Sequence, residues 1–116
     1  MFSQSQLSNL YSALTAIEGL TVYHYVAPSS KSLPYCIWAE NGELSSFNAS
    51  NHKAEQEIDG YVDYFTQTEF DPMFDQIQEA LNGIENCGWT FESAQYGDPT
   101  REDDNAIHYT WSWRLA

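Results

Sequence analysis

The chain has 116 residues, and its 17 acidic side chains outnumber its 4 basic ones, which gives a formal net charge of −13 at pH 7. This length predicts one compact domain, because two separate cores of half the size would each bury too little surface to be stable. The scarcity of Lys and Arg argues against a duplex-binding surface, since those side chains neutralise phosphates. The hydrophobic fraction of 42% argues against an acidic disordered tail, and no apolar run is long enough to span a membrane.

The cysteines and histidines do not form a recognisable reactive or metal-binding motif. Cys36 and Cys87 lie far apart and belong to no Cys/His cluster, so both are interpreted as small apolar side chains rather than as zinc ligands or a disulfide framework. The three histidines fall on separate segments without the spacing of a metal site. No motif supplies a nucleophile, a base and an orienting group together. We therefore expect no metal, no cofactor and no enzymatic activity.

The first half of the chain predicts a helix followed by two strands. Apolar residues recur every three or four positions over residues 4–17, the pattern of an amphipathic helix. The β-branched and aromatic residues at 21–25 predict a short strand, and a second strand is expected from residue 33 to about residue 40. Asn41 and Gly42 predict either a tight turn or a bulge before residues 44–47, with the bulge favoured.

A polar stretch over residues 48–53 is interpreted as a loop that precedes a third strand over residues 56–67. Asp71 and Pro72 predict the N-cap and first residue of a second helix. The apolar stripe of this helix is expected to comprise Phe70, Met73, Phe74, Ile77, Leu81 and Ile84.

Two further strands are expected over residues 88–96 and 106–115, joined by a charged loop. The last of them alternates strictly, which predicts one buried face that contains Trp111 and Trp113. The element order is helix, three strands, helix, two strands. That order predicts a single α+β domain over residues 1–116, with an antiparallel or mixed sheet of about five strands and both helices packed on one face.

Acidic residues are concentrated in two places. Asp71, Asp75 and Glu79 are spaced four residues apart, so they are expected to form one acidic face of the second helix. This face is interpreted either as a solubilising surface or as a surface that repels DNA or docks a basic partner. A second cluster, formed by Glu102, Asp103 and Asp104, lies in the last loop.

Four short stretches mark the layout of these segments: Leu33-Pro34-Tyr35, Phe47-Asn48-Ala49-Ser50, Ile58-Asp59-Gly60-Tyr61-Val62-Asp63-Tyr64-Phe65 and His108-Tyr109-Thr110-Trp111-Ser112-Trp113. Together with the N-terminal helix, this layout resembles the small tail-completion proteins of long-tailed bacteriophages. The likeness covers nearly the whole chain, from the N-terminal helix to an aromatic closing strand.

The resemblance implies a tail terminator, a structural protein that forms a hexameric ring on the tail tube and stops its elongation. Its implied partners are other copies of itself, the tail tube protein and the head-tail connector protein. DNA passes through such a ring without sequence-specific binding, and no membrane is involved. The implied location is the tail or neck of the virion, after assembly in the host cytoplasm.

The residues expected at the interfaces of such a ring lie in the two polar loops. They are Asn48, Asn51, His52, Lys53, Arg101, Glu102, Asp103 and Asp104. The acidic face of Asp71, Asp75 and Glu79 is expected to line the lumen or to dock a partner.

Other functions stay open at this point. A connector or stopper has the same expected features as a terminator. The charge of −13 also suits an acidic DNA mimic that inhibits a host nucleic-acid-binding enzyme. A carbohydrate-binding module would need accessible aromatic side chains, such as those of Trp38 or Trp89.

Overall fold

A computed structural model describes residues 4–49, 52–97 and 105–116, and it describes only the backbone of residues 44–49 and 52–55. Its two helices and five strands follow the expected order, which confirms the α+β prediction. They are α1 (Gln4–Thr15), β1 (Val22–His24), β2 (Tyr35–Ala49), β3 (His52–Thr66), α2 (Met73–Asn82), β4 (Cys87–Tyr96) and β5 (Ile107–Leu115).

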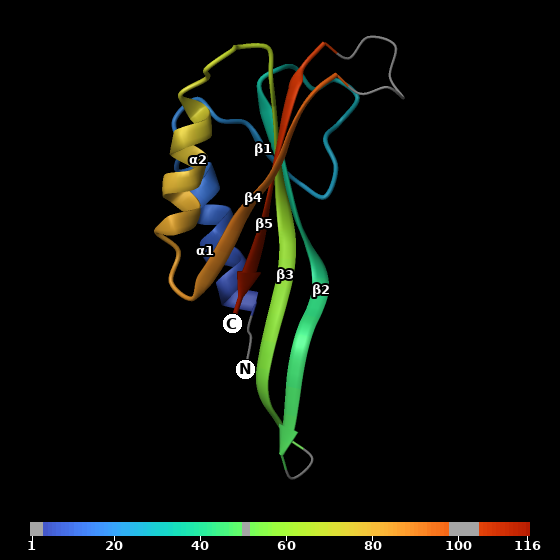
Figure 1. Cartoon of the computed structure of the whole chain (residues 1–116), viewed down its shortest axis with the longest axis vertical. Coiled ribbons are helices and arrows are strands. Elements are labelled where there is room, and N and C mark those ends of the chain that lie inside the picture. Colours follow the sequence, from blue (N-terminus) through green and yellow to red (C-terminus); the bar gives the residue numbers. More distant parts are fainter. Residues whose placement is uncertain (1–3, 50–51, 98–104) are drawn as a thin grey trace.

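The strands form one mixed sheet in the order β1-β2-β3-β5-β4. β1 runs parallel to β2, and the other neighbouring strands are antiparallel. Both helices cover the same face of this sheet, as expected (Figure 1). No helix in the described part of the chain is long and apolar enough to cross a membrane.

The core lies between the helices and the sheet. α1 contributes its leucine stripe, α2 contributes Ile77 and Leu81, and β5 contributes Trp111 and Trp113, which are completely buried. The strict alternation of β5 therefore predicted its buried face correctly. Cys36 is also completely buried, whereas Cys87 is half-buried, and both thiols are free.

Residues 48–49 and 52–53 of the polar stretch lie in strands rather than in the predicted loop. β2 continues through a register shift between Glu40 and Gly42, which confirms the favoured bulge, and it pairs with β3 as far as Ala49 opposite His52. Asn48 lies opposite Lys53 in the same ladder. The prediction was wrong because polar residues leave the sheet only where their backbone groups find no strand partner, and here each strand supplies the other with hydrogen bonds.

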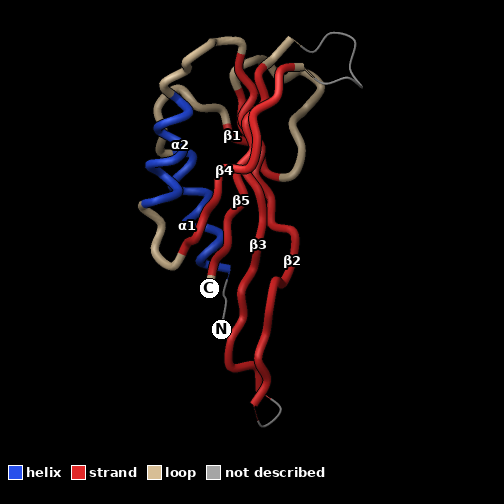
Figure 2. Tube along the Cα trace, viewed as in Figure 1, coloured by secondary structure: helices blue, strands red, loops and turns tan. Residues whose placement is uncertain are grey.

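The β2–β3 hairpin extends beyond the rest of the sheet (Figure 2). The pairing of β3 with β5 ends at Ile58 opposite Leu115. Residues 44–49 and 52–57 consequently form a two-stranded arm, which we call the hairpin arm. It projects from the end of the sheet at which β5 and the chain finish (Figure 1).

The second helix begins later than expected. Pro72 is its N-cap and Met73 its first residue, so Asp71 precedes the helix rather than belonging to its acidic face. Phe70 was assigned to the apolar stripe, but its side chain is 91% exposed and its φ is +57°. That left-handed backbone conformation departs from the helical path, so Phe70 is not in phase with the residues that follow.

Candidate functional site

A groove of about 890 Å³ lies between the first turn of α2 and the adjoining ends of β4 and β5. We call it the α2–β4 groove. Its apolar lining is mostly aromatic and comes from three separate parts of the chain: Phe70, Phe74, Phe91, Tyr96, Ile107 and Tyr109. Its volume lies within the usual range for ligand-binding clefts, about 300–1,000 Å³.

The floor of the groove continues into the core through packed aromatic rings. The Phe74 ring stands edge-on to that of Phe91, with 5.3 Å between the ring centroids, and to that of Tyr109 at 5.0 Å. The same ring lies 5.1 Å from that of the buried Trp111. Edge-to-face contacts of this kind favour one packing arrangement.

The rim of the groove is exposed and aromatic. The side chain of Phe70 is 91% exposed, that of Tyr96 is 77% exposed, and that of Phe91 is 39% exposed. Single exposed apolar residues are ordinary, but a cluster of them beside a cleft is typical of a binding surface.

Asp71 holds the loop between β3 and α2 in place. Its Oδ2 accepts hydrogen bonds from the hydroxyls of Tyr64 at 2.6 Å and Thr66 at 2.7 Å. Its Oδ1 accepts one from the backbone N–H of Met73 at 2.9 Å. Burial raises the pKa of the Asp71 carboxyl, but these hydrogen bonds outweigh burial and the net shift of its pKa is downward. Asp71 is therefore an ionised positioning residue.

The groove carries only negative charge in its described lining. Glu69 and Asp75 are exposed and lie beside the aromatic rim, and Asp71 completes the set of carboxylates. No Lys or Arg is among the described residues that line the groove. The groove therefore favours a ligand that combines an apolar group with positive charge.

The acidic face predicted for the second helix is shorter than expected. Asp75 and Glu79 are both exposed on α2, but only Asp75 lines the groove. Asp71 is engaged in hydrogen bonds before the helix starts. The acidic face therefore reduces to two carboxylates that point to solvent.

The other predicted interface residues fall into two groups. Asn48, His52 and Lys53 belong to the strands of the hairpin arm rather than to a loop. Five further residues lie outside the described parts of the chain, namely Asn51, Arg101, Glu102, Asp103 and Asp104.

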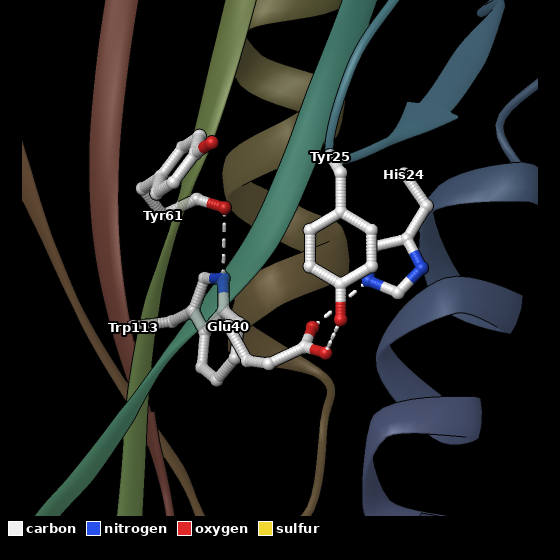
Figure 3. A network of polar contacts seen from close by, with 5 residues as sticks. All are labelled: His24, Tyr25, Glu40, Tyr61 and Trp113. Atoms are coloured by element: carbon white, nitrogen blue, oxygen red, sulfur yellow. Dashed lines mark hydrogen bonds and ion pairs between the residues drawn. The ribbon is translucent and has the colours of Figure 1, made fainter.

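A polar cluster joins β1 to β2 (Figure 3). The carboxylate of Glu40 contacts Nε2 of His24 at 2.8 Å and accepts a hydrogen bond from the Tyr25 hydroxyl. The His24 ring is stacked between those of Tyr25 and Trp38, with centroid distances of 3.8 and 3.9 Å. Burial raises the pKa of Glu40, but the hydrogen bonds with Tyr25 and His24 lower it by more, so the net shift of its pKa is downward. The cluster anchors the short edge strand.

A side-chain hydrogen bond joins β5 to β3. The indole Nε1 of Trp113 donates a hydrogen bond to the backbone carbonyl of Tyr61 at 3.1 Å (Figure 3). Because this bond satisfies the one polar atom of the buried ring, Trp113 packs in the core without a desolvation penalty.

His108, the other histidine whose side chain the structure describes, contacts one carboxylate on the helix-free face of the sheet. Nε2 of His108 lies 3.2 Å from Oδ1 of Asp63, which also accepts a hydrogen bond from the Thr110 hydroxyl at 2.8 Å. Among the described residues, no three His, Cys, Asp or Glu side chains are placed to hold a metal ion together.

The tryptophans named for a sugar platform are poorly placed for that role. Trp38 is only 2% exposed. Trp89 is half-buried and donates a hydrogen bond from Nε1 to the side-chain oxygen of Asn82 at 3.3 Å. Among the side chains that the structure describes, the two most exposed aromatic ones are instead Phe70 and Tyr96 at the groove.

Sequence reasoning missed the α2–β4 groove. Its residues come from three segments that only the fold brings together, and Phe70 fits a helical apolar spacing as well as a buried residue does. One local signal was present: Phe70 lies just before Asp71-Pro72, where a chain that enters a helix commonly turns. No protein-family model matches the chain, and no curated protein matches its sequence.

Proposed function

We propose that the protein is a structural assembly protein that forms a homo-oligomeric ring and terminates the tail tube of a long-tailed bacteriophage. The observation that carries this proposal is the hairpin arm, which extends beyond the last residue pair between β3 and β5. The tail-specific part of the proposal rests on the likeness of the segment layout to tail-completion proteins.

The arm supports assembly for an energetic reason. A two-stranded hairpin with no third strand and no helix packed on it is marginally stable in water. Residues 44–49 and 52–57 form such a hairpin over the described backbone. Contact with a neighbouring subunit or with the tube would bury the arm and stabilise it. Asn48, His52 and Lys53 of the arm therefore remain the proposed interface residues.

The proposed ring acts by binding and stoichiometry, without turnover. It caps the tube, stops the addition of tube subunits, and offers its other surface to the head-tail connector. The exposed carboxylates of Asp75 and Glu79 suit the lumen of such a ring, because fixed negative charges repel the phosphates of passing DNA.

Light scattering on a sizing column tests the ring, at low and moderate salt, with and without purified tail tubes. We expect either a particle of about six times the 13.3 kDa subunit mass or a monomer that caps tube ends and halts their growth. A monomer or dimer that leaves tube elongation unchanged would contradict the proposal.

A shortened variant tests the arm itself. Replacing residues 44–57 with Asn-Gly would join Glu43 to Ile58, which already face each other in the ladder, by a favoured two-residue turn. We expect this variant to fold, with one cooperative thermal transition followed by circular dichroism, and to lose ring formation and tube capping. Capping that persists without the arm would contradict its role.

A further inference from the structure

We propose that the α2–β4 groove binds a peptide segment of another protein, in which an aromatic or aliphatic side chain is flanked by Lys or Arg. The segment would lie along the free edge of β4 and place its apolar side chain between Phe70 and Tyr96. This binding activity is separate from the proposed ring and does not require it.

The first argument is the exposure and conformation of Phe70. The φ of Phe70 is +57°, a conformation that is unfavourable for a bulky side chain, and such conformations cluster at functional sites. Here the strained residue also presents a side chain that is 91% exposed. The hydrogen bonds of Asp71 hold the following loop, so Phe70 is kept at the rim before any ligand arrives.

The second argument is charge complementarity. Glu69 and Asp75 flank the aromatic rim, and the described lining holds no cation. Lys31 lies over the Tyr35 ring, with Nζ 6.0 Å from its centroid, and Arg114 lies beside Gly88, so neither neutralises the groove. Cations on a ligand would meet two exposed carboxylates there.

The third argument is the position of β4 at the end of the sheet. In the described chain β4 pairs with β5 and with no other strand, so the backbone groups along its other edge can accept an added strand. Phe91 and Tyr96 of the same strand line the groove. A peptide on this edge would send alternate side chains toward the aromatic rim.

The net charge favours another protein over a second copy as the occupant. Each copy carries a formal charge of −13, so two copies repel each other and an acidic groove gains little from a surface of the same sign. A basic segment gains from the same field.

The probe is a set of fluorescein-labelled synthetic peptides Gly-Lys-Val-Arg-Xaa-Lys-Val-Gly, in which Xaa is Phe, Trp or Leu, measured by fluorescence anisotropy at physiological salt. We expect saturable binding by at least one of them. The matched peptide with Glu in place of each Lys and Arg should not bind. The matched peptide with Ala at Xaa should bind about tenfold more weakly, as expected when an interface anchor is truncated.

Matched protein variants locate the binding. Phe70→Ala and Tyr96→Ala should weaken it about tenfold, whereas Val26→Ala, at a residue that is 74% exposed but outside the groove, should change it less than about twofold. Asp75→Lys should weaken it about fivefold or more, and Glu79→Lys, the same charge change on the same helix outside the groove, should have a smaller effect.

Three results would overturn the inference. The first is no saturable binding by any peptide of the set, and the second is an equal loss with Asp75→Lys and Glu79→Lys, which would mean non-specific charge attraction. The third is a smaller oligomer for Phe70→Ala in light scattering, which would mean that a second copy occupies the groove. Because the wild-type oligomer is measured separately, failure of the groove and failure of the ring are distinguishable.

Discussion

The hydroxyl of Tyr64 donates a hydrogen bond to Oδ2 of Asp71, with 2.6 Å between the two oxygens. Tyr64 is a completely buried residue of β3, and Asp71 precedes α2. The bond therefore joins the end of β3 to the start of α2. The loop between these two elements places Phe70 at the rim of the groove. A core contact thus sets the shape of the proposed binding surface.

We expect Asp71→Ala to destabilise the fold by about 3 kcal/mol, because it removes a charged acceptor that receives three hydrogen bonds, one of them from the hydroxyl of the buried Tyr64. Tyr64→Phe removes one of the three hydrogen bonds and should lower the free energy of unfolding by about 1.5 kcal/mol. Urea unfolding measures both. Glu79→Ala is the control, since this exposed carboxylate should change stability by less than about 0.5 kcal/mol. A loss for Asp71→Ala no greater than that control would contradict the assigned role.

The same carboxylate predicts a pH dependence. The pKa of Asp71 is lower in the folded protein than in the unfolded chain, where Asp titrates near about 3.9. Its contribution is therefore fully present above the unfolded pKa and is lost as the pH falls through the folded pKa. We expect the stability difference between wild type and Asp71→Asn to shrink between pH 6 and pH 3. The pKa of Glu40 is also lowered, but its contribution to stability is the same in both proteins and cancels in the difference. A difference that stays constant over this range would mean that the ionised form is not what stabilises the loop.

Sequence patterns were informative wherever a residue's burial follows from its own strand or helix. The alternation of β5 predicted that Trp111 and Trp113 are buried, and the element order predicted the α+β fold. The pairing of residues 48–49 with 52–53 in the hairpin arm was missed because these residues belong to a polar stretch, so no apolar alternation marks them. The arm forms through hydrogen bonds between the backbones of β2 and β3. Such pairing cannot be predicted from the order of polar and apolar side chains alone.

The groove was missed for a different reason. Helical spacing assigns Phe70 and Phe74 to the same stripe, but the helix begins only at Met73, and the φ of Phe70 sends the chain in another direction. Periodicity contains no information about such a break. Tyr96 lies far along the chain, so only the register of β4 on β5 brings it to the same cleft.

Gly60 provides a strong test of the sheet packing. A Cβ at this position would overlap the backbone carbonyl oxygen of Ala39 and the indole ring of Trp113. Because that indole is held by its hydrogen bond to the Tyr61 carbonyl, it has little freedom to move away. We expect Gly60→Ala to destabilise the fold by about 3 kcal/mol or to prevent folding, as overpacking of a core does.

Gly42→Ala is the matched control, since a Cβ there meets no atom within 4 Å. This variant should change the unfolding free energy by less than about 0.5 kcal/mol. Thermal unfolding followed by circular dichroism compares the two variants with wild type. Equal destabilisation by the two substitutions would mean that the contacts with Ala39 and Trp113 do not decide the outcome.

The two thiols should differ sharply in reactivity. Burial raises the pKa of Cys36 to about 12, with a further contribution from the charge of Asp63. Burial also raises the pKa of Cys87, against an opposing effect of Arg114, but this side chain is only half-buried. Because the thiolate is the reactive form, we expect iodoacetamide at pH 8 to modify Cys87 at least about tenfold faster than Cys36, as measured by peptide mass spectrometry.

The dependence of the Cys36 modification rate on sub-denaturing urea then shows which unfolding event exposes this thiol. Because Cys36 is completely buried near the start of β2, where this strand pairs with both β1 and β3, it becomes accessible only when the sheet opens. Its modification rate should therefore rise with urea as steeply as the unfolding equilibrium does, whereas the rate of Cys87 should depend on urea more weakly. A Cys36 rate that is insensitive to urea would mean that β1 and β2 separate locally, and it would contradict the anchoring role assigned to the His24–Glu40 contact.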